Sequence, residues 1–504
     1  MSATGEAYDA LIVHTRKTAV LKSAASVLSW DRETNMPSKA VGHRAEQLAL
    51  LAGMAHDRET APEVDDWLAA CEAEPLEDEP HGVMATNTRE LRRQYDKRVK
   101  VPKDLVEAIS RTTTLGNQAW ASARELNQFD TFRPHLAEIV NLTQQLADAV
   151  GYKTNRYDAL LDEYEPGARS EAIAAVFAVL RDQLVPLIDQ IAASGNHPDR
   201  SILTGTYDVG QQQVFMKMLA TAMGYDFDAG RLDTVVHPFC IGLGPCDHRI
   251  TSRWDANYLS CGLYSVLHEA GHALYEQNRP KQHWGTPAGA SMSLGIHESQ
   301  SRLWENAIGR GRPFWQHFYP QLQGVFRSQL GNVSLDDFVF AVNDVRRSFI
   351  RVEADEGTYN LHIILRFELE QALIAGELTA ADVPDAWNGK FREIFGLEVP
   401  DDTQGCLQDV HWSFGSFGYF PTYTLGNLYA AQLYGCARRE LPKLEEDLAN
   451  GRLKVLLDWL RDRVHRHGRC YYASELIESV TGEALSPSHL VAALTERYTQ
   501  LYAL

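Results

Sequence analysis

The segment from Leu263 to Leu274 reads LYSVLHEAGHAL and decides the expected fold, because its apolar side chains have helical spacing. These side chains recur three or four positions apart and predict an amphipathic helix with one buried stripe. His268 and His272, four residues apart, would share one face of this helix, so both imidazole rings can face one metal ion. Glu269 lies one position further round, where a carboxylate can accept a proton from a water activated by the metal.

Helical periodicity extends well beyond this segment. Residues 136–150 carry apolar side chains on one face, and so do those from Ser334 to Val352, where a capping signature marks a helix start. Strand-like sequence is sparse, and its best case, Thr234–Arg253, predicts a hairpin or an edge strand just before the histidine-bearing helix. The expected fold is mostly α, a large helical fold with one small β-sheet beside that helix.

The domain organisation follows from the absence of long linkers and internal repeats. We expect a single unit over residues 1–504. A punctuated stretch at Ser194–Ser201 also allows two lobes, over roughly 1–200 and 201–504.

The composition excludes several classes of partner. The chain has 504 residues with 48 basic and 67 acidic side chains, and its net charge of −19 argues against nucleic acid and anionic membranes. No apolar run approaches the roughly 20 residues of a membrane span, and the N-terminus lacks the apolar core of a signal peptide. Seven cysteines without a Cys-x-x-Cys pair favour a reducing compartment. We therefore expect a cytoplasmic protein.

The third metal ligand is not decided by spacing. Catalytic zinc takes three protein ligands, and Tyr275 and Asn278 exclude a metzincin-type third histidine. Glu276 follows on the same helix, and Glu298 and Glu305 share a face of the next helical pattern, Ser293–Gly309. All three carboxylates remain candidates at this point.

Six motifs occur in a fixed order between His237 and Trp412. They are His237-Pro238-Phe239, Asp247–Thr251, His268–His272, His297–Gln300, Ile350–Asp355 and Gly405–Trp412. With these motifs the sequence resembles the carboxypeptidase Taq family of metallocarboxypeptidases. The resemblance implies one zinc ion per subunit held by His268, His272 and Glu298, with Co²⁺ as a substitute, and Glu269 as the general acid/base. It also implies a mostly helical fold with a deep central groove, and a homodimer.

A carboxypeptidase must also bind the terminal carboxylate of its substrate, and a guanidinium forms a two-pronged, charge-assisted pair with a carboxylate. We expect Arg351 to bind this carboxylate, with Arg249 as the other candidate. The structural alternatives are an ion pair of Arg351 with Asp355, four residues away, and one of Arg249 with Asp247.

Further residues of the motifs are candidates for the site. We expect His411 and Tyr423 to donate hydrogen bonds to the oxyanion of the tetrahedral intermediate. The alternative is that their aromatic loop only lines the groove. His237, extended because Pro238 follows it, is expected to contact the substrate backbone. From the last motif we add Gln408 and Asp409 to the expected substrate-binding residues.

Together these residues predict a zinc-dependent metallocarboxypeptidase that hydrolyses the C-terminal peptide bond and releases single amino acids with broad specificity. Its partners would be peptides with a free C-terminus. A metallo-oligopeptidase or a dipeptidyl carboxypeptidase could use the same metal site. A non-enzymatic helical scaffold with a structural metal is the third alternative, but an open coordination position beside a glutamate would serve no purpose there.

Overall fold

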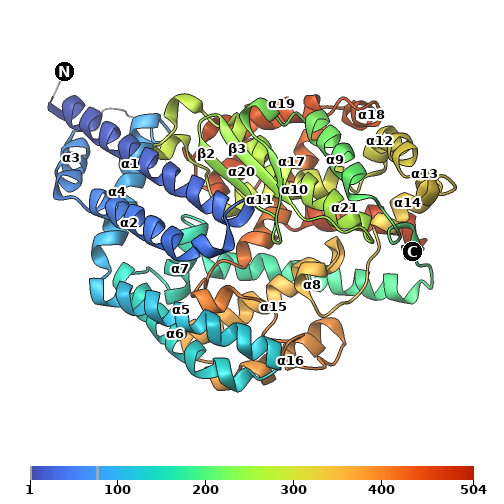
Figure 1. The fold of residues 1–504 in the computed structure, drawn as a ribbon, viewed down its shortest axis with the longest axis horizontal. Coiled ribbons are helices and arrows are strands. Elements are labelled where there is room, and N and C mark those ends of the chain that lie inside the picture. Colours follow the sequence, from blue (N-terminus) through green and yellow to red (C-terminus); the bar gives the residue numbers. More distant parts are fainter. Residues whose placement is uncertain (1–2, 75–78) are drawn as a thin grey trace. The chain divides into compact units, whose positions relative to one another are not determined.

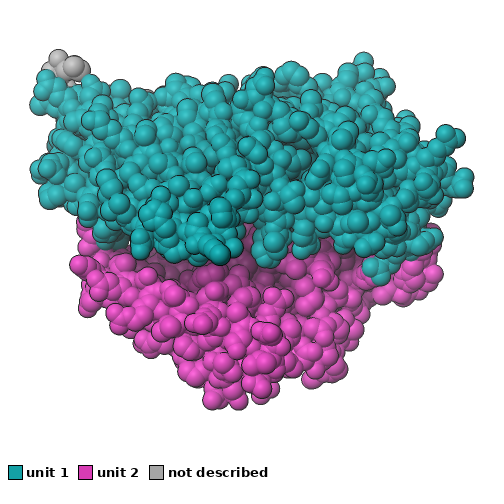
Figure 2. All heavy atoms as spheres, viewed as in Figure 1, with its two compact units in different colours: residues 1–98, 198–342, 429–484 teal, residues 99–197, 343–428, 485–504 magenta. Residues whose placement is uncertain are grey.

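The computed structural model describes residues 3–74 and 79–504, and helices account for most of this part of the chain (Figure 1). Two compact units are distinguished, and each is assembled from three separate segments (Figure 2). Unit 1 comprises Met1–Arg98, Pro198–Val342 and Tyr429–Ala484, and unit 2 comprises Val99–His197, Asn343–Leu428 and Leu485–Leu504. Within the described ranges, no helix is both long and apolar enough to cross a membrane.

Unit 1 contains most of the N-terminal helices and the helices that surround the small sheet. The helices that lie wholly or mostly in this unit are α1 (Ala3–Thr34), α2 (Val41–Glu59), α3 (Pro62–Ala73), α4 (Val83–Lys100), α9 (Val209–Met223), α10 (Leu259–Asn278), α11 (Leu294–Arg302), α12 (Arg312–Val325), α13 (Arg327–Leu330), α14 (Leu335–Val342), α17 (Pro421–Glu440), α18 (Leu444–Ala449), α19 (Lys454–Arg463) and α20 (Ala473–Thr481). α1 packs against both α2 and α3, and α10 packs against α9 and α11.

The sheet of unit 1 has three strands, β1 (Leu232–Thr234), β2 (Cys240–Gly244) and β3 (Asp247–Ser252), in the order β1-β3-β2. β2 and β3 form the antiparallel hairpin predicted for this stretch, and β1 adds to β3 in parallel. β3 packs against α10, so the sheet lies beside the predicted metal-binding helix (Figure 1). Both sequence-based expectations, a mostly helical fold and one small sheet at this helix, are confirmed.

Helix α10 forms where the apolar spacing predicts it, and its apolar stripe is buried. The buried stripe comprises Leu259, Leu263, Val266, Leu267, Ala270, Ala273 and Leu274. The helices α10 and α11 approach closely at Gly271, where an added Cβ would lie 2.7 Å from both Gln300 O and Ser301 Cα. A larger residue at this position would push the two helices apart. The glycine therefore lets α11 bring its side chains up to the two histidines of α10.

The chain after α11 continues as a π-helical turn, Leu303–Ile308. The helix predicted for Ser293–Gly309 is thus helical throughout most of its length but changes its winding at Leu303. Single π-helical turns recur at functional sites because they change which face the following side chains occupy. Here the π-helical turn carries Glu305.

Unit 2 is built around one almost entirely buried helix, α15 (Glu356–Ala375), which packs against helices from the other segments of this unit. The packing partners include α6, which confirms the helix predicted over residues 136–150. The other helices of unit 2 are α5 (Lys103–Leu126), α6 (Phe129–Val150), α7 (Arg156–Tyr164), α8 (Ser170–Ala193), α16 (Val383–Phe395) and α21 (Ser488–Tyr502).

The helix predicted from Ser334 to Val352 is wrong beyond Val342, where α14 ends. Backbone N–H groups after this point donate to side chains instead of to carbonyls four residues earlier. Val345 N donates to the Tyr502 hydroxyl at 2.7 Å, and Arg346 N donates to Asp355 Oδ2 at 3.0 Å. The apolar side chains that continue the pattern are therefore placed by tertiary contacts and not by a continuous helix.

Candidate active site

Three donor atoms of unit 1 converge where the sequence predicts a metal centre. Glu298 Oε2 lies 3.7 Å from His268 Nε2 and 3.5 Å from His272 Nε2. All three donor atoms lie within 4.8 Å of one another, and within residues 3–74 and 79–504 no other group of His, Cys, Asp or Glu has this arrangement. The histidines come from α10 and the glutamate from α11, two helices that pack directly on each other.

In both histidines, Nδ1, the ring nitrogen that does not face Glu298, lies within hydrogen-bond distance of an acceptor oxygen. His268 Nδ1 lies 2.8 Å from Glu305 Oε2, and His272 Nδ1 lies 3.0 Å from the carbonyl oxygen of His297. A proton on each Nδ1 satisfies these acceptors and leaves the lone pair of each Nε2 directed at Glu298. Ligating histidines in proteins are oriented in this way by a carboxylate or a carbonyl behind the ring.

Glu298 is anchored from its other side. Arg302 Nε donates to Glu298 Oε1 at 2.6 Å, and Arg302 Nη1 donates to Glu305 Oε2 at 3.2 Å. Burial alone would raise the pKa of Glu298, but Arg302 and the two histidines hold it well below its usual range. The carboxylate is therefore ionised, as a metal ligand must be.

The donor set fits a tetrahedral divalent ion of the zinc type. Bonds of about 2.1 Å to an ion place two tetrahedral ligand atoms about 3.4 Å apart. The two measured separations, 3.5 and 3.7 Å, are close to this value without any rearrangement. Two histidines and one carboxylate also leave a fourth position open, the arrangement of catalytic rather than structural zinc.

The two other candidate carboxylates have different partners. Glu276 Oε1 lies 3.0 Å from His297 Nε2, and its Oε2 is paired with Arg279. Glu305 lies behind His268, at the ring nitrogen opposite the one that faces Glu298. The geometry thus separates three carboxylates that sequence spacing left equivalent.

Glu269 is buried next to the three donor residues, and its carboxylate has no hydrogen bond or ion pair with any described residue. Burial raises the pKa of Glu269 to about 7, with Glu298 and Glu305 adding to the rise and His272 opposing it. A carboxylate whose pKa lies near neutrality can both accept and release a proton, which suits a general acid/base.

A second cluster of predicted residues lies in unit 2, around Asp409. Arg351 donates from Nε and Nη2 to Asp409 Oδ1 at 3.0 and 2.7 Å, and Arg366 Nε donates to Asp409 Oδ2 at 2.6 Å. Burial would raise the pKa of Asp409, but the two guanidiniums hold it far below its usual range. The structural alternative of an Arg351–Asp355 pair is wrong, because Asp355 instead caps α15 by accepting from Thr358 N at 3.0 Å.

His411 and Tyr423 lie side by side in unit 2, with His411 Nε2 3.5 Å from the Tyr423 hydroxyl. The pKa of His411 is lowered to about 4, chiefly by burial, with Asp409 opposing the shift and Arg351 and Arg366 adding to it. The imidazole is therefore neutral at pH 7. Tyr423 lies in the first turn of α17 and not in a loop, because Pro421 begins that helix with a favourable backbone angle.

Of the remaining predicted residues, Gln408 and Arg249 have structural partners. Gln408 Oε1 accepts from Arg351 N at 2.9 Å, so its amide supports the backbone of the arginine. Arg249 forms a two-pronged pair with Asp247, both contacts at 2.8 Å, and lies 4.2 Å from the ring centre of Trp30. His237 is exposed. The ion pair of Arg249 with Asp247, which the sequence also allowed, is therefore present.

Residues 10–498 match the family model described as carboxypeptidase Taq (M32) metallopeptidase. The chain belongs to this family. It is 46% identical over 505 residues to thermostable carboxypeptidase 1 of Thermus thermophilus, covering 98% of this chain and 99% of the relative. It is 37% identical to carboxypeptidase 1 of Bacillus subtilis, over 95% of this chain and 96% of the relative. The crystal structure of the M32 carboxypeptidase from Deinococcus radiodurans superposes with a TM-score of 0.95 at 39% identity, covering 99% of this chain and all of that chain.

As a member of the M32 family, the protein is a metallocarboxypeptidase, a hydrolase that acts on peptides and uses a metal ion. Family membership and the convergent donor atoms of α10 and α11 agree on the presence of a metal centre.

Sequence reasoning missed two buried charges of this carboxypeptidase, Arg366 and Glu370, which lie four residues apart on α15. Glu370 accepts hydrogen bonds from the Tyr157 hydroxyl at 2.7 Å, Trp412 Nε1 at 2.9 Å and Gly418 N at 3.0 Å. It thereby holds both ends of the segment from Trp412 to Gly418, which directly follows His411. A signal existed in the sequence, because a charged pair within an otherwise apolar helical run must find buried partners.

Proposed function

We propose that this metallocarboxypeptidase uses zinc to hydrolyse the C-terminal peptide bond of peptides, releasing single amino acids with broad specificity. The observation that carries the proposal is the convergence of His268, His272 and Glu298 beside a buried, unpaired Glu269. A scaffold with a structural metal would need neither an open ligand position nor a carboxylate that titrates near neutrality.

His268, His272 and Glu298 would hold one zinc ion per subunit, and the same donors accept Co²⁺. The bound ion supplies Lewis acidity, which lowers the pKa of water and polarises the scissile carbonyl. Glu305 and Arg302 would keep the ligands in place, since Glu305 contacts His268 at 2.8 Å and Arg302 contacts Glu298 at 2.6 Å.

Glu269 would act as general base and then as general acid. Its buried carboxylate takes a proton from the attacking water and returns it to the amine of the departing residue. A pKa of about 7 suits both directions of transfer, because neither protonation state is strongly favoured at neutral pH.

Arg351 would bind the terminal carboxylate of the peptide, because a permanently charged, buried guanidinium with a planar fork matches that group. Asp409 and Gln408 would act by fixing its orientation, and Arg249 and the exposed His237 would contact the substrate elsewhere. Binding through the terminal carboxylate restricts cleavage to the last peptide bond. One residue is then released in each turnover.

His411 and Tyr423 would donate hydrogen bonds to the oxyanion of the tetrahedral intermediate. The neutral imidazole and the phenol can both donate a hydrogen bond, and His411 Nε2 lies 3.5 Å from the Tyr423 hydroxyl, so both groups can reach the same oxyanion.

We propose a cytoplasmic homodimer. All seven cysteines are free thiols, which suits a reducing compartment. The dimer is what the family resemblance implies.

The deciding experiment compares a peptide with a free C-terminus and its C-terminal amide. Mass spectrometry of the zinc-loaded enzyme should show a ladder of single-residue losses from the acid and almost none from the amide. Internal cleavage of both peptides would indicate an oligopeptidase, and losses of two residues would indicate a dipeptidyl carboxypeptidase. Metal content of Glu298→Ala, set beside Glu276→Ala, tests the ligand assignment separately: only the first variant should lose its zinc.

A further inference from the structure

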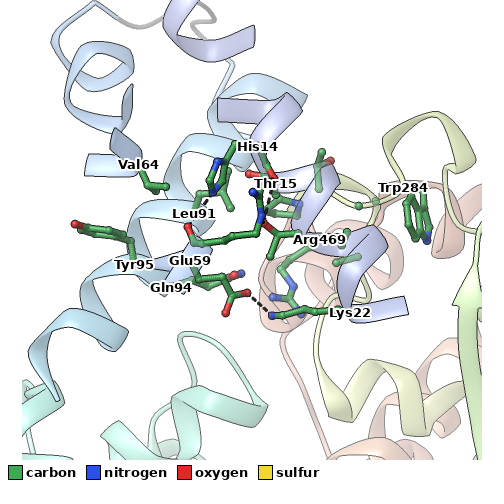
Figure 3. Close-up of a pocket in the computed structure, with 18 of the residues that line it drawn as sticks. His14, Thr15, Lys22, Glu59, Val64, Leu91, Gln94, Tyr95, Trp284 and Arg469 are labelled. Atoms are coloured by element: carbon green, nitrogen blue, oxygen red, sulfur yellow. Dashed lines mark hydrogen bonds and ion pairs between the residues drawn. The ribbon is translucent and has the colours of Figure 1, made fainter. Parts of the chain in front are cut away.

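Unit 1 contains a cavity of about 360 Å³ (Figure 3). Neither Glu269 nor any of the proposed metal ligands lines this cavity. It is lined by residues of α1, α2, α3 and α4, by the segment 284–290 and by Arg279 and Arg469. Cavities of this size bind small organic molecules in other proteins.

The charge of the lining is strongly unbalanced. Five cationic side chains line the cavity, Lys22, Arg58, Arg98, Arg279 and Arg469, and the single carboxylate among the lining residues is that of Glu59. Glu59 is already shared, because it pairs with Lys22, as Figure 3 shows, and with Arg98 at 3.1 Å. Arg279 is paired with Glu276 behind the wall.

Two of the five cations have no carboxylate partner among the described residues. Arg469 donates from Nε to Ser291 O at 2.8 Å, and neither of its terminal nitrogens has a hydrogen bond with a residue that the structure describes. Arg58 donates from Nε to Thr18 Oγ1 at 2.9 Å and from Nη2 to His14 O at 3.1 Å. Burial lowers the pKa of Arg469, and the nearby Glu90 opposes this shift without offsetting it. An anion in the cavity would pair with the two guanidiniums that form no ion pair with a described carboxylate.

The rest of the wall is apolar. Val64 and Tyr95 lie on one side of the view in Figure 3 and Trp284 on the other, and Leu91 and Pro287 also line the cavity. An inorganic anion would satisfy the arginines but would leave these surfaces without a partner. A zwitterionic amino acid would bring an ammonium group among five cations. A carboxylate attached to an apolar body matches both parts of the lining.

We propose that this cavity is a binding site for a small organic carboxylate with an aromatic or branched apolar body and no ammonium group. Its carboxylate pairs with Arg469, with Arg58 contributing charge, and its body packs against Tyr95 and Trp284. The site is independent of the peptidase reaction and of the roles proposed above for Arg351 and the metal ligands.

The test uses 4-bromobenzoate as the probe and the full chain carrying Arg351→Ala, so that the proposed substrate-carboxylate site does not contribute. Isothermal titration calorimetry should show one saturable site for 4-bromobenzoate, and none for the neutral 4-bromobenzamide. The anomalous signal of bromine in a soaked crystal should lie in the cavity beside Arg469.

Adding Arg469→Gln should weaken binding at least about 10-fold, because a charge-assisted hydrogen bond is lost. Arg469→Lys should restore part of the affinity. The matched control is Arg466→Gln, which changes an exposed arginine outside the cavity and should leave binding unchanged. Arg58→Gln gives a second, independent reduction if Arg469→Gln fails to fold, which a melting curve would reveal.

Several results would overturn the proposal: no saturable binding of 4-bromobenzoate, equal binding of the amide, bromine located elsewhere, or unchanged affinity in folded Arg469→Gln and Arg58→Gln. Binding of inorganic phosphate in preference to 4-bromobenzoate would also overturn it, because the apolar wall would then play no part.

Discussion

Glu269 in unit 1 is buried and Asp409 in unit 2 is largely buried, both at predicted site positions, yet the pKa values of their carboxyl groups move in opposite directions. Burial raises the pKa of Glu269 to about 7, because no guanidinium or hydrogen-bond donor contacts it. The same effect acts on Asp409, but Arg351 and Arg366 reverse it and hold its pKa far below the usual range. Burial thus prepares the carboxyl group of Glu269 to exchange protons. The two arginines overcome the same effect at Asp409 and keep its carboxylate charged.

The two clusters also differ in how the chain assembles them. The three convergent donor atoms of unit 1 come from two helices that follow each other in sequence and pack together at a glycine. The Arg351–Asp409 pair of unit 2 joins residues 58 positions apart. A local cluster can be identified from spacing, whereas a long-range ion pair depends on packing.

The largest expected effect concerns the proton-exchanging carboxyl. Glu269→Gln should lower kcat by at least ~10²-fold, because general acid/base catalysis typically contributes 10²- to 10⁴-fold. Zinc content should stay stoichiometric, since all three ligands remain. Steady-state kinetics together with metal analysis checks this. Near-wild-type turnover by Glu269→Gln with stoichiometric zinc would show that Glu269 does not exchange protons in the reaction.

Arg351→Ala should lower kcat/KM by about 10- to 150-fold, since a charged hydrogen bond of roughly 1.5 to 3 kcal/mol to the substrate is lost. The ratio of kcat/KM for the acid and amide forms of one peptide should fall with it, and zinc should be retained. If the role of Arg351 is only to neutralise Asp409, the variant would melt at a lower temperature and keep its preference for the acid.

Glu305→Ala tests whether the local cluster depends on the group behind His268. Zinc affinity should fall by about 10- to 100-fold, the usual cost of losing a partner of a ligating histidine. Competition with a chromogenic chelator measures this directly. The effect should be smaller than that of Glu298→Ala, and the opposite order would reverse the assignments of the two glutamates.

The smallest expected effect is on the pH dependence of stability, and it concerns the buried carboxyl group of Glu370. Burial raises the pKa of Glu370 from 4.5 to about 7, although three hydrogen-bond donors oppose the rise. Between these two pH values the folded state therefore binds a proton that the unfolded state has released. Stability contributed by this proton is present at low pH and is lost as the pH rises through about 7. The loss amounts to about 3 kcal/mol.

Melting temperatures measured from about pH 5 to pH 8 should therefore fall more steeply for the wild-type chain than for Glu370→Gln, which cannot titrate. The variant is expected to be less stable at low pH because its amide replaces one acceptor oxygen. Parallel slopes for the two proteins would show that Glu370 does not change its protonation in this range.

The sequence by itself determined the mostly helical fold, the small sheet beside α10 and the grouping of His268, Glu269 and His272. All of these depend on contacts between residues a few positions apart, for which helical periodicity and turn signals are direct evidence. Six ordered motifs were also sufficient to identify the family, which the comparisons confirm.

Only the tertiary structure decided which buried groups partner each other. Spacing left Glu276, Glu298 and Glu305 equivalent, and packing of α11 and the π-helical turn on α10 separated them. Spacing also allowed Asp355 as a partner of Arg351, whereas the fold supplies Asp409. The physical reason is that a buried charge must be compensated by whichever group the packing brings to it, and that group need not be near in sequence.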